Sequence, residues 1–166
     1  MDSNDPARKL LLNRALELFQ EAYDRQLGGQ LDDAVSLYNE SIEVCPTAEA
    51  HTFLGWTYSF QGKLTEAIAE CQKAIELDPD FGNPYNDIGA YLIELEKYDE
   101  AIPWLERAVQ ATRYETYHIP WFNLGRAFAA KEHYGRALEC LRESLTHDPE
   151  YAPARDAVSA IRLKIH

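Results

Sequence analysis

Apolar residues recur along this chain at the spacing of one face of an α-helix. In residues 64–77 they fall at i, i+1, i+4, i+7 and i+8, namely at Ala67, Ile68, Cys71, Ala74 and Ile75. No run of four or more residues alternates apolar and polar side chains in the way of a β-strand. The pattern therefore predicts an all-α protein.

The helical segments repeat with a period near 34 residues. A Leu-Gly or Ile-Gly pair recurs at spacings of 34 and 36, at Leu54-Gly55, Ile88-Gly89 and Leu124-Gly125. An alanine recurs in the same register, at Ala34, Ala67, Ala101 and Ala137. Prolines close three of the units, at Pro46, Pro79 and Pro149. A fixed period of this length indicates stacked pairs of helices rather than one closed core.

These residues and their period resemble the tetratricopeptide repeat, and the fourth unit shows the pattern best. It carries Trp121, Leu124, Gly125, Phe128, Ala137 and Pro149 at the repeat's positions. The resemblance implies a right-handed α-solenoid of helix-turn-helix repeats with a C-terminal capping helix. It implies one domain, residues 1–166, with these parts: an N-terminal helix extension over 6–14, a degenerate repeat over 15–47, further repeats over 48–81, 82–115 and 118–151, and a capping helix over 152–166.

The small residues of the repeat predict where two helices approach closely. Glycine costs a helix about 1 kcal/mol relative to alanine, yet it recurs at 55, 89 and 125. A side chain there is expected to collide with the partner helix, with the alanines at 67, 101 and 137 lying opposite. Glycine also marks the turns of the first two units, whereas Glu96 and Glu132 occupy that place in the third and fourth.

The connection between the third and fourth units is two residues longer than the others. The excess falls around Thr116-Tyr117, which we expect to lie in the joining loop. Arg113 stands where the other units have a proline, so the preceding helix has no hard stop. That helix is therefore expected to run a turn further.

The first helix is predicted to be unusually long, from Asp5-Pro6 to Leu27. It carries two apolar stripes, Leu11-Ala15-Leu18-Ala22 and Leu12-Leu16-Phe19-Tyr23. One stripe can face its own repeat. The second is interpreted as an exposed interaction surface, which could support a homodimer; the alternative is that it seals the protein's own end.

In the family that this chain resembles, the first helix of each repeat lines a concave groove that holds ligand peptides. Mapping that groove onto the chain gives the expected partner-binding residues Leu16, Phe19, Tyr23, Phe53, Trp56, Phe60, Asn86, Phe122, Asn123 and Arg126. Phe53, Trp56 and Phe60 lie on one helix face and are not signature residues of the repeat. They are interpreted as an apolar binding stripe, with packing inside the protein or against a dimer mate as the alternative.

The polar residues of the same set suggest how a ligand would be held. The amide of Asn86 or Asn123 would bond to a ligand's backbone. Arg126 would contact a carboxylate. The resemblance does not extend to a chaperone-type carboxylate clamp, because Arg126 alone cannot form one.

Charge and chemistry narrow the function further. The formal net charge is −12, and residues 1–81 hold 15 of the 28 acidic residues but only 6 of the 16 basic ones. This excess opposes binding to nucleic acid or to an anionic membrane. The three cysteines form no CxxC, and no signal peptide or membrane span is recognisable, so a cytoplasmic location with reduced thiols is expected.

Motifs of catalysis or cofactor binding are not found. The sequence has no glycine-rich phosphate loop, no HExxH and no GxSxG, and its five histidines are scattered. The chain is therefore expected to have no enzymatic activity, no cofactor and no metal.

The sequence thus predicts a scaffold or adaptor that binds an apolar peptide or helix of a protein partner in the concave groove. Two alternatives remain open: a small, acidic, cytosolic secretion chaperone of the tetratricopeptide type, and a self-associating structural module. Charge and length are compatible with the first, and the second stripe of the N-terminal helix with the second.

Overall fold

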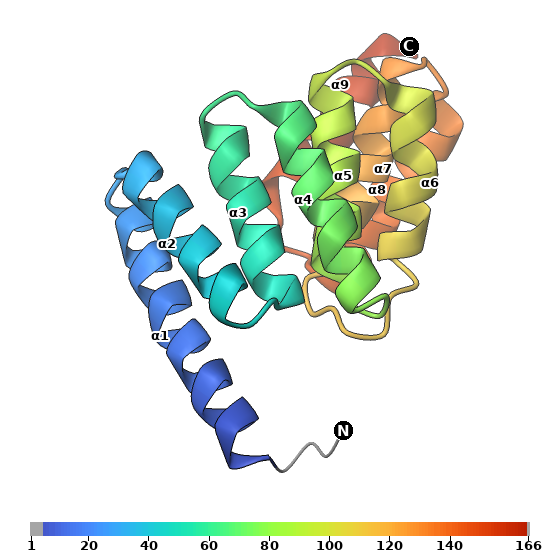
Figure 1. Cartoon of the computed structure of the whole chain (residues 1–166). Helices are drawn as coiled ribbons and strands as arrows, with labels where there is room; N and C mark the ends of the chain where they lie inside the picture. Colours follow the sequence, from blue (N-terminus) through green and yellow to red (C-terminus); the bar gives the residue numbers. More distant parts are fainter. Residues whose placement is uncertain (1–4, 166) are drawn as a thin grey trace. The chain divides into compact units, whose positions relative to one another are not determined.

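The computed structural model describes residues 5–165, and its secondary structure over this range is helical. The prediction of an all-α fold is confirmed, since the range contains no β-strand beyond one isolated backbone bridge. The chain divides between Pro79 and Asp80 into two compact units, which are described separately. Figure 1 labels the helices of both units.

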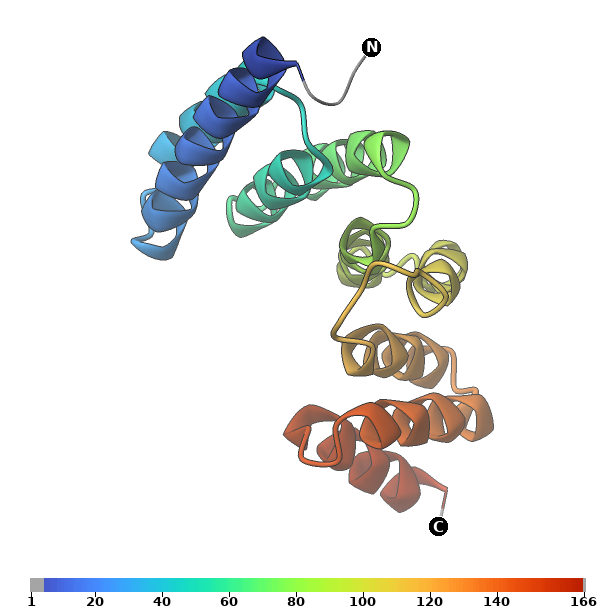
Figure 2. The same ribbon diagram turned by 90° about the horizontal axis from the view of Figure 1, so that it is seen from below.

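The first unit holds two antiparallel helix hairpins (Figure 2). The hairpins pair α1 (Pro6–Leu27) with α2 (Leu31–Val44), and α3 (Ala48–Phe60) with α4 (Leu64–Leu77). Its core is a cluster of buried apolar side chains: Ala22, Ala34, Tyr38 and Leu54. The Ser41 hydroxyl donates a hydrogen bond of 2.7 Å to the Ala15 carbonyl, which ties α2 to α1.

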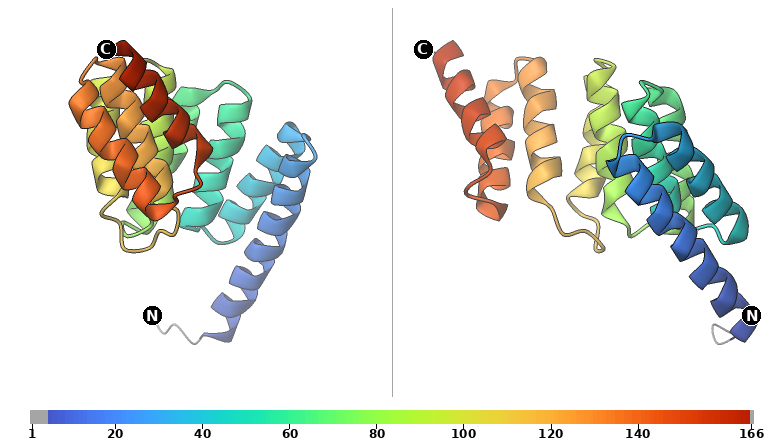
Figure 3. Two further views of the ribbon diagram at one scale, coloured as in Figure 1. Left: turned by 180° about the vertical axis from the view of Figure 1, so that it is seen from behind. Right: turned by 90° about the vertical axis from the view of Figure 1, so that its left-hand side faces the viewer.

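The second unit holds two more hairpins and a last helix (Figure 3). The hairpins pair α5 (Gly82–Glu94) with α6 (Tyr98–Ala108), and α7 (His118–Ala130) with α8 (Tyr134–His147). Helix α9 (Ala152–Lys164) packs on α7 and α8 through the buried Ala154 and Ile161. Its outer side chains are exposed, so α9 covers the apolar face of α8 as a capping helix must.

The repeated glycines lie where paired helices touch. A Cβ atom added at Gly55 would come within 2.9 Å of the Ala67 carbonyl oxygen, as the register of the repeat predicts. In the second unit a leucine side chain lies nearest to each repeated glycine. A Cβ at Gly89 would overlap the Leu105 side chain, and one at Gly125 would come within 2.7 Å of Leu141 Cγ. Ala137 lies opposite Gly125 as predicted, with its carbonyl oxygen at 3.3 Å, but a leucine side chain is the nearest group at both glycines.

The turns inside the hairpins share one backbone conformation whether or not glycine is present. Gly29 and Gly62 have φ of 75°, which is the left-handed region. Glu96 and Glu132 adopt φ of 59° and 60° at the matching turns. The surrounding hairpin thus imposes on glutamate a conformation that an L-residue adopts at some cost in energy.

The connection from α6 to α7 corrects one expectation and bears out another. Thr116 and Tyr117 lie in the loop, as expected. Helix α6, however, does not run further; it ends at Ala108 and is 11 residues long, against 14 for α8. The chain leaves the helix early because Arg113 pairs with the start of the unit. Its amide donates to the Asp80 carbonyl, and its carbonyl accepts from the Gly82 amide, both at 3.0 Å.

The long first helix is present, and its N-terminal end extends beyond the end of α2 (Figure 1). Asp5 caps it by accepting a hydrogen bond from the Ala7 amide. Of the stripe expected to face its own repeat, Ala15, Leu18 and Ala22 are buried. Leu11 is not; it is 52% exposed.

Candidate functional site

Five rings from α1 and α3 form one continuous aromatic patch in the first unit. Helix α1 supplies its residues at i and i+4 and α3 supplies its own at i, i+3 and i+7, so each set lies on one helix face. We call this set the aromatic patch: Phe19, Tyr23, Phe53, Trp56 and Phe60. The structure therefore brings together the predicted aromatic residues of this unit.

The rings meet edge to face or tilted, which fixes their orientation. Phe53 lies at the centre, with its ring centroid 5.2 Å from that of Phe19 and 5.6 Å from that of Tyr23. The row continues from Phe53 to Trp56 at 5.7 Å and from Trp56 to Phe60 at 5.2 Å. Such contacts stabilise aromatic pairs by about 0.5–1.5 kcal/mol each beyond their burial. The patch is thus preorganised.

Burial differs between the two ends of the patch. At the inner end Phe19 packs on Tyr38, which is fully buried and donates its hydroxyl to Gln26 at 2.8 Å. The four rings from Phe19 to Trp56 are half-buried, and Phe60 is 57% exposed. Leu16, on the α1 side, is 51% exposed. The inner rings therefore pack inside the unit, and the outer end is open to a partner.

The surroundings of the inner end are acidic. Burial raises the pKa of the Tyr38 hydroxyl, and the nearby Tyr23 and Asp24 raise it further. Asp24 therefore places its negative charge beside the aromatic patch, where it also accepts a hydrogen bond from Gln20. An apolar partner segment that carries basic residues would be favoured here over an acidic one.

The remaining predicted residues form a polar row in the second unit. The Asn123 amide donates to Asn86 Oδ1 at 3.0 Å, and Arg126 donates to Asn123 Oδ1 at 3.1 Å. Arg126 also lies over the Phe122 ring, which meets the ring of Tyr151 at 5.3 Å. Asn86 and Asn123 are buried and bonded to each other. The guanidinium of the exposed Arg126 is the group of this row that a ligand reaches first.

Asp87 stands next to this row and was not singled out by the sequence. Burial raises the pKa of its carboxyl group to about 7, although a hydrogen bond from Asn86 at 3.4 Å lowers it in part. Arg126 borders a hollow of about 350 Å³ whose walls include Ile93, Ala129, Ala157 and Lys164. The hollow is therefore mainly apolar, with the cationic side chains of Arg126 and Lys164 in its walls.

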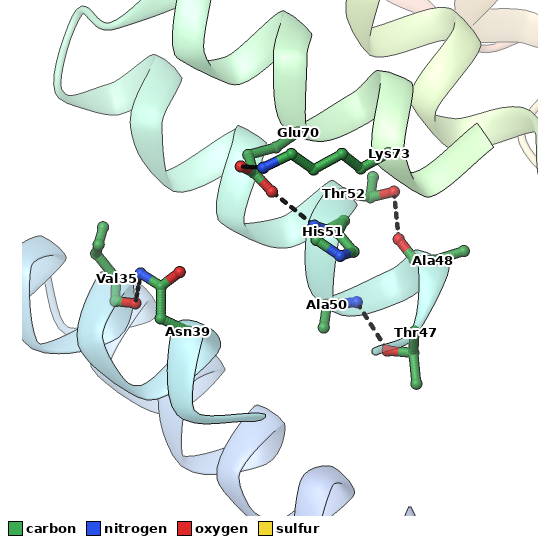
Figure 4. Close-up of polar contacts among 9 residues, drawn as sticks. All are labelled: Val35, Asn39, Thr47, Ala48, Ala50, His51, Thr52, Glu70 and Lys73. Carbon is green, nitrogen blue, oxygen red and sulfur yellow. Dashed lines mark hydrogen bonds and ion pairs between the residues drawn. The ribbon is translucent and has the colours of Figure 1, made fainter. Parts of the chain in front are cut away.

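An ionic cluster between α3 and α4, in which His51 and Glu70 are buried, was also missed (Figure 4). His51 Nδ1 lies 2.6 Å from Glu70 Oε2, and Lys73 Nζ lies 2.7 Å from Glu70 Oε1. An ionised carboxylate can only accept, so His51 Nδ1 carries the proton. Burial by itself would raise the pKa of Glu70, but the hydrogen bonds and charges of His51 and Lys73 outweigh it and lower that pKa.

This cluster joins the two helices of the hairpin. Its three groups satisfy one another, and residues 5–165 contain no group of three or more His, Cys, Asp or Glu side chains that could hold a metal ion. Over the same range, none of the helices has the length and apolar character needed to cross a membrane. Cys71 and Cys140 are buried thiols, and burial raises the pKa of Cys140 to about 11.

Comparison with known families and structures identifies the repeat. Two models, both described as tetratricopeptide repeat, match residues 48–81 and 80–150. A Protein SGT1 homolog from Oryza sativa is 42% identical over 74 residues, which are 44% of this chain and 20% of that protein. The type IV pilus assembly protein PilF of Pseudomonas aeruginosa is 27% identical over 145 residues, covering 76% of this chain and 58% of PilF. The chain thus spans less than two thirds of either relative.

Solved structures share the fold. The structure of Pseudomonas aeruginosa PilF superposes with a TM-score of 0.85 at 22% identity, over 95% of this chain and 70% of that one. The first repeat domain of Spaghetti (RPAP3), bound to the HSP90 peptide SRMEEVD, superposes with a TM-score of 0.67 at 23% identity, over 71% and 92%. At these identities the likeness supports the all-α solenoid fold and no more.

Proposed function

Because this chain belongs to the tetratricopeptide repeat family, we propose that it is a non-catalytic adaptor that binds an apolar segment of a partner protein. The observation that carries the proposal is the aromatic patch of α1 and α3 with its open end at Phe60. Rigid aromatic rings bury a large area at little cost in side-chain entropy, which is typical of binding hot spots.

The partner segment is expected to be apolar with flanking basic residues. An apolar side chain that covers Phe60 and Trp56 would remove the exposed part of the aromatic patch from water. The ring contacts of Phe53 with Tyr23 and Trp56 fix the orientation of the patch. Asp24 at the inner end and the excess of acidic residues in positions 1–81 favour cations at the edges. Electrostatic repulsion would weaken the binding of a matching acidic segment.

The relatives support the class of function rather than a particular partner. One is named as a pilus assembly protein, another as Hsp70-Hsp90 organizing protein 3 of Arabidopsis thaliana, and a neighbouring structure holds a peptide. The relatives carry different names although they share the repeat, so we expect the ligand to depend on the side chains that line each repeat. We propose a cytoplasmic setting, because all three cysteines are free thiols.

A defined peptide pair tests the proposal. The probe is an amphipathic peptide of about 18 residues, five helical turns, with a leucine and phenylalanine face and lysines on its flanks. Its mate carries glutamates in place of the lysines. Trp104→Phe and Trp121→Phe leave Trp56 as the reporter among the three tryptophans. The lysine peptide should shift Trp56 emission to shorter wavelength, and calorimetry should give its Kd.

Two variants test whether the lysine peptide binds at the aromatic patch or elsewhere on the surface. Phe60→Ser should weaken binding of the lysine peptide about tenfold or more. Leu77→Ser is the matched control, because Leu77 is 48% exposed in the same unit but lies on α4, outside the patch. Equal Kd values for Phe60→Ser and the unchanged chain, or equal binding of the two peptides, would rule the proposal out.

A further inference from the structure

The hairpin of α7 and α8 repeats that of α3 and α4 with different side chains at the same positions. Helix α7 begins and ends 70 residues after α3, and α8 does so after α4. The close approach of the helices is kept as well. A Cβ at Gly55 or Gly125 would meet the carbonyl oxygen of the opposite alanine, at 2.9 Å and 3.3 Å. Differences between matching positions therefore concern side chains rather than the backbone.

In the first hairpin three of these positions hold the ionic cluster (Figure 4). His51 and Lys73 both bond to the carboxylate of Glu70, so the cluster compensates its own acid. The matching positions of the second hairpin hold different groups: Trp121, Cys140 and Glu143. A buried thiol has replaced the central carboxylate, and an acid has replaced the lysine.

These three residues line a hollow of about 560 Å³ bordered by α6, α7 and α8. Its apolar surface includes Leu124 and Phe128, which are buried. Trp121 is half-buried in the wall, so part of its indole ring is accessible to a ligand. The hollow therefore offers an apolar surface with one accessible aromatic ring.

The charged groups around the hollow are mostly acidic. Glu106 of α6 lies in its wall with Glu139 and Glu143 of α8, against one cation, Arg136. The Arg136 guanidinium lies 4.3 Å from the centroid of the Phe128 ring. Among residues 5–165, none of the three glutamates has an ion-pair partner. The hollow thus lacks the internal compensation that the first hairpin has.

Two of these carboxylates converge on the base of the hollow, where Cys140 lies. The pKa of the Cys140 thiol is raised by burial, lowered by Arg136, and raised by Glu139 and Glu106. Both glutamates therefore act on the same place although they come from different helices. Their negative potential favours a cation that enters the hollow from outside.

We propose that this hollow is a second binding surface, which takes an arginine of a partner protein next to a large apolar side chain. A planar guanidinium is suited to stack on Trp121 while it donates hydrogen bonds to Glu139 and Glu143. The apolar neighbour covers Leu124 and Phe128. Lysine is less suited, because its ammonium group is a compact, strongly hydrated charge without a planar face. The proposal does not depend on the aromatic patch, which belongs to the other unit.

The probe is a peptide with blocked ends in which one arginine lies between leucines. Its matched controls replace the arginine by lysine, or by citrulline, which keeps the shape of arginine but carries no charge. Trp56→Phe with Trp104→Phe leaves Trp121 as the reporter among the three tryptophans. The arginine probe should change Trp121 emission, and calorimetry should give its Kd. The citrulline form should bind about tenfold more weakly or worse, with the lysine form between the two.

Glu139→Gln with Glu143→Gln should raise the Kd of the arginine probe about tenfold or more. Both residues are exposed, so the variant should stay folded, which circular dichroism verifies. Glu94→Gln with Glu96→Gln is the matched control. It removes the same charge from exposed positions at the end of α5, outside the hollow, and should leave the Kd unchanged.

Phe60→Ser separates this surface from the aromatic patch, because it should weaken the lysine peptide of the first unit and leave the arginine probe unaffected. A Kd of the arginine probe that rises in Phe60→Ser would assign the probe to the aromatic patch and overturn the proposal. Equal binding of the arginine and citrulline forms would overturn it too. So would equal Kd values for the Glu139→Gln, Glu143→Gln variant and the unchanged chain, or constant Trp121 emission up to about 1 mM probe.

Discussion

At the scale of single residues, the glycines of the repeat show where side chains are excluded. Gly89 and Gly135 are both helical, but they differ in what lies opposite. A Cβ at Gly89 would overlap the Leu105 side chain, whereas nothing lies within 4 Å of one at Gly135. The same substitution at the two sites therefore isolates packing from helix propensity.

Gly89→Ala should lower the free energy of unfolding by about 1–3 kcal/mol, because Leu105 must leave its position in the hairpin. Gly135→Ala, the matched control, should raise it by up to about 1 kcal/mol through helix propensity alone. Urea denaturation followed by circular dichroism measures both. A stabilised Gly89→Ala would contradict the close approach of α5 and α6.

Residue spacing predicted the aromatic patch but not the polar contacts. Phe53, Trp56 and Phe60 lie on one helix face by periodicity alone, so the sequence identifies them. The contact of His51 with Glu70 joins residues 19 apart on two helices. It depends on how the side chains of a hairpin meet, and a one-dimensional period does not contain that information.

At the scale of whole elements, the repeat predicted the helices and their turns but not the end of α6. The absence of proline at Arg113 was expected to lengthen α6, yet α6 stops at Ala108. Hydrogen bonds of Arg113 to Asp80 and Gly82 require extended backbone there. A tertiary contact thus ends the helix where the local sequence contains no stop signal.

Arg113→Pro tests that account, since proline is the residue of the other repeats at this position. It should lower the free energy of unfolding by about 1–2 kcal/mol, because it removes the amide that donates to Asp80. The guanidinium that lies 4.1 Å from the Phe81 ring centroid is lost as well. Arg113→Lys keeps the backbone amide and should lower the free energy of unfolding by less. Thermal melts of both variants measure these differences in stability. A proline variant that is more stable than the unchanged chain would mean that the backbone hydrogen bonds of Arg113 do not stabilise the unit.

At the scale of the whole molecule, the fold was predictable because the period near 34 recurs over most of the chain. The dependence of its stability on pH was not predictable, since it depends on two carboxyl groups in different surroundings. The pKa of Glu70 is lowered by His51 and Lys73 against the effect of burial, and that of Asp87 is raised by burial. The two groups change stability with pH in opposite directions.

Glu70 stabilises the first unit above the pKa that its carboxyl group has in the unfolded chain. Glu70→Gln should lower the free energy of unfolding at pH 7 by about 1–3 kcal/mol, because His51 and Lys73 lose their ionised acceptor. This difference should shrink as the pH falls through the lowered pKa, where the unchanged chain is protonated too. Glu66→Gln, exposed on the same helix, is the control and should change little at any pH.

Asp87 acts in the opposite sense in the second unit. Its pKa of about 7 lies above the usual value near 3.9, so the unfolded chain ionises first as the pH rises. Between about pH 4 and pH 7 the folded state therefore loses stability relative to the unfolded one. Asp87→Asn removes the titration and should raise the free energy of unfolding at pH 8 by about 1–3 kcal/mol, with little gain at pH 4.

Urea titrations of the Asp87→Asn variant and the unchanged chain from pH 4 to pH 8 measure this difference. The Asn86 amide can still donate to the new side-chain oxygen, so the substitution keeps the hydrogen bond of the site. A gain in the free energy of unfolding that grows with pH would mean that the Asp87 carboxylate is uncompensated next to the polar row that ends at Arg126. A gain that is the same at both ends of the range would show that Asp87 has the same pKa in the folded and the unfolded chain and that burial does not raise it.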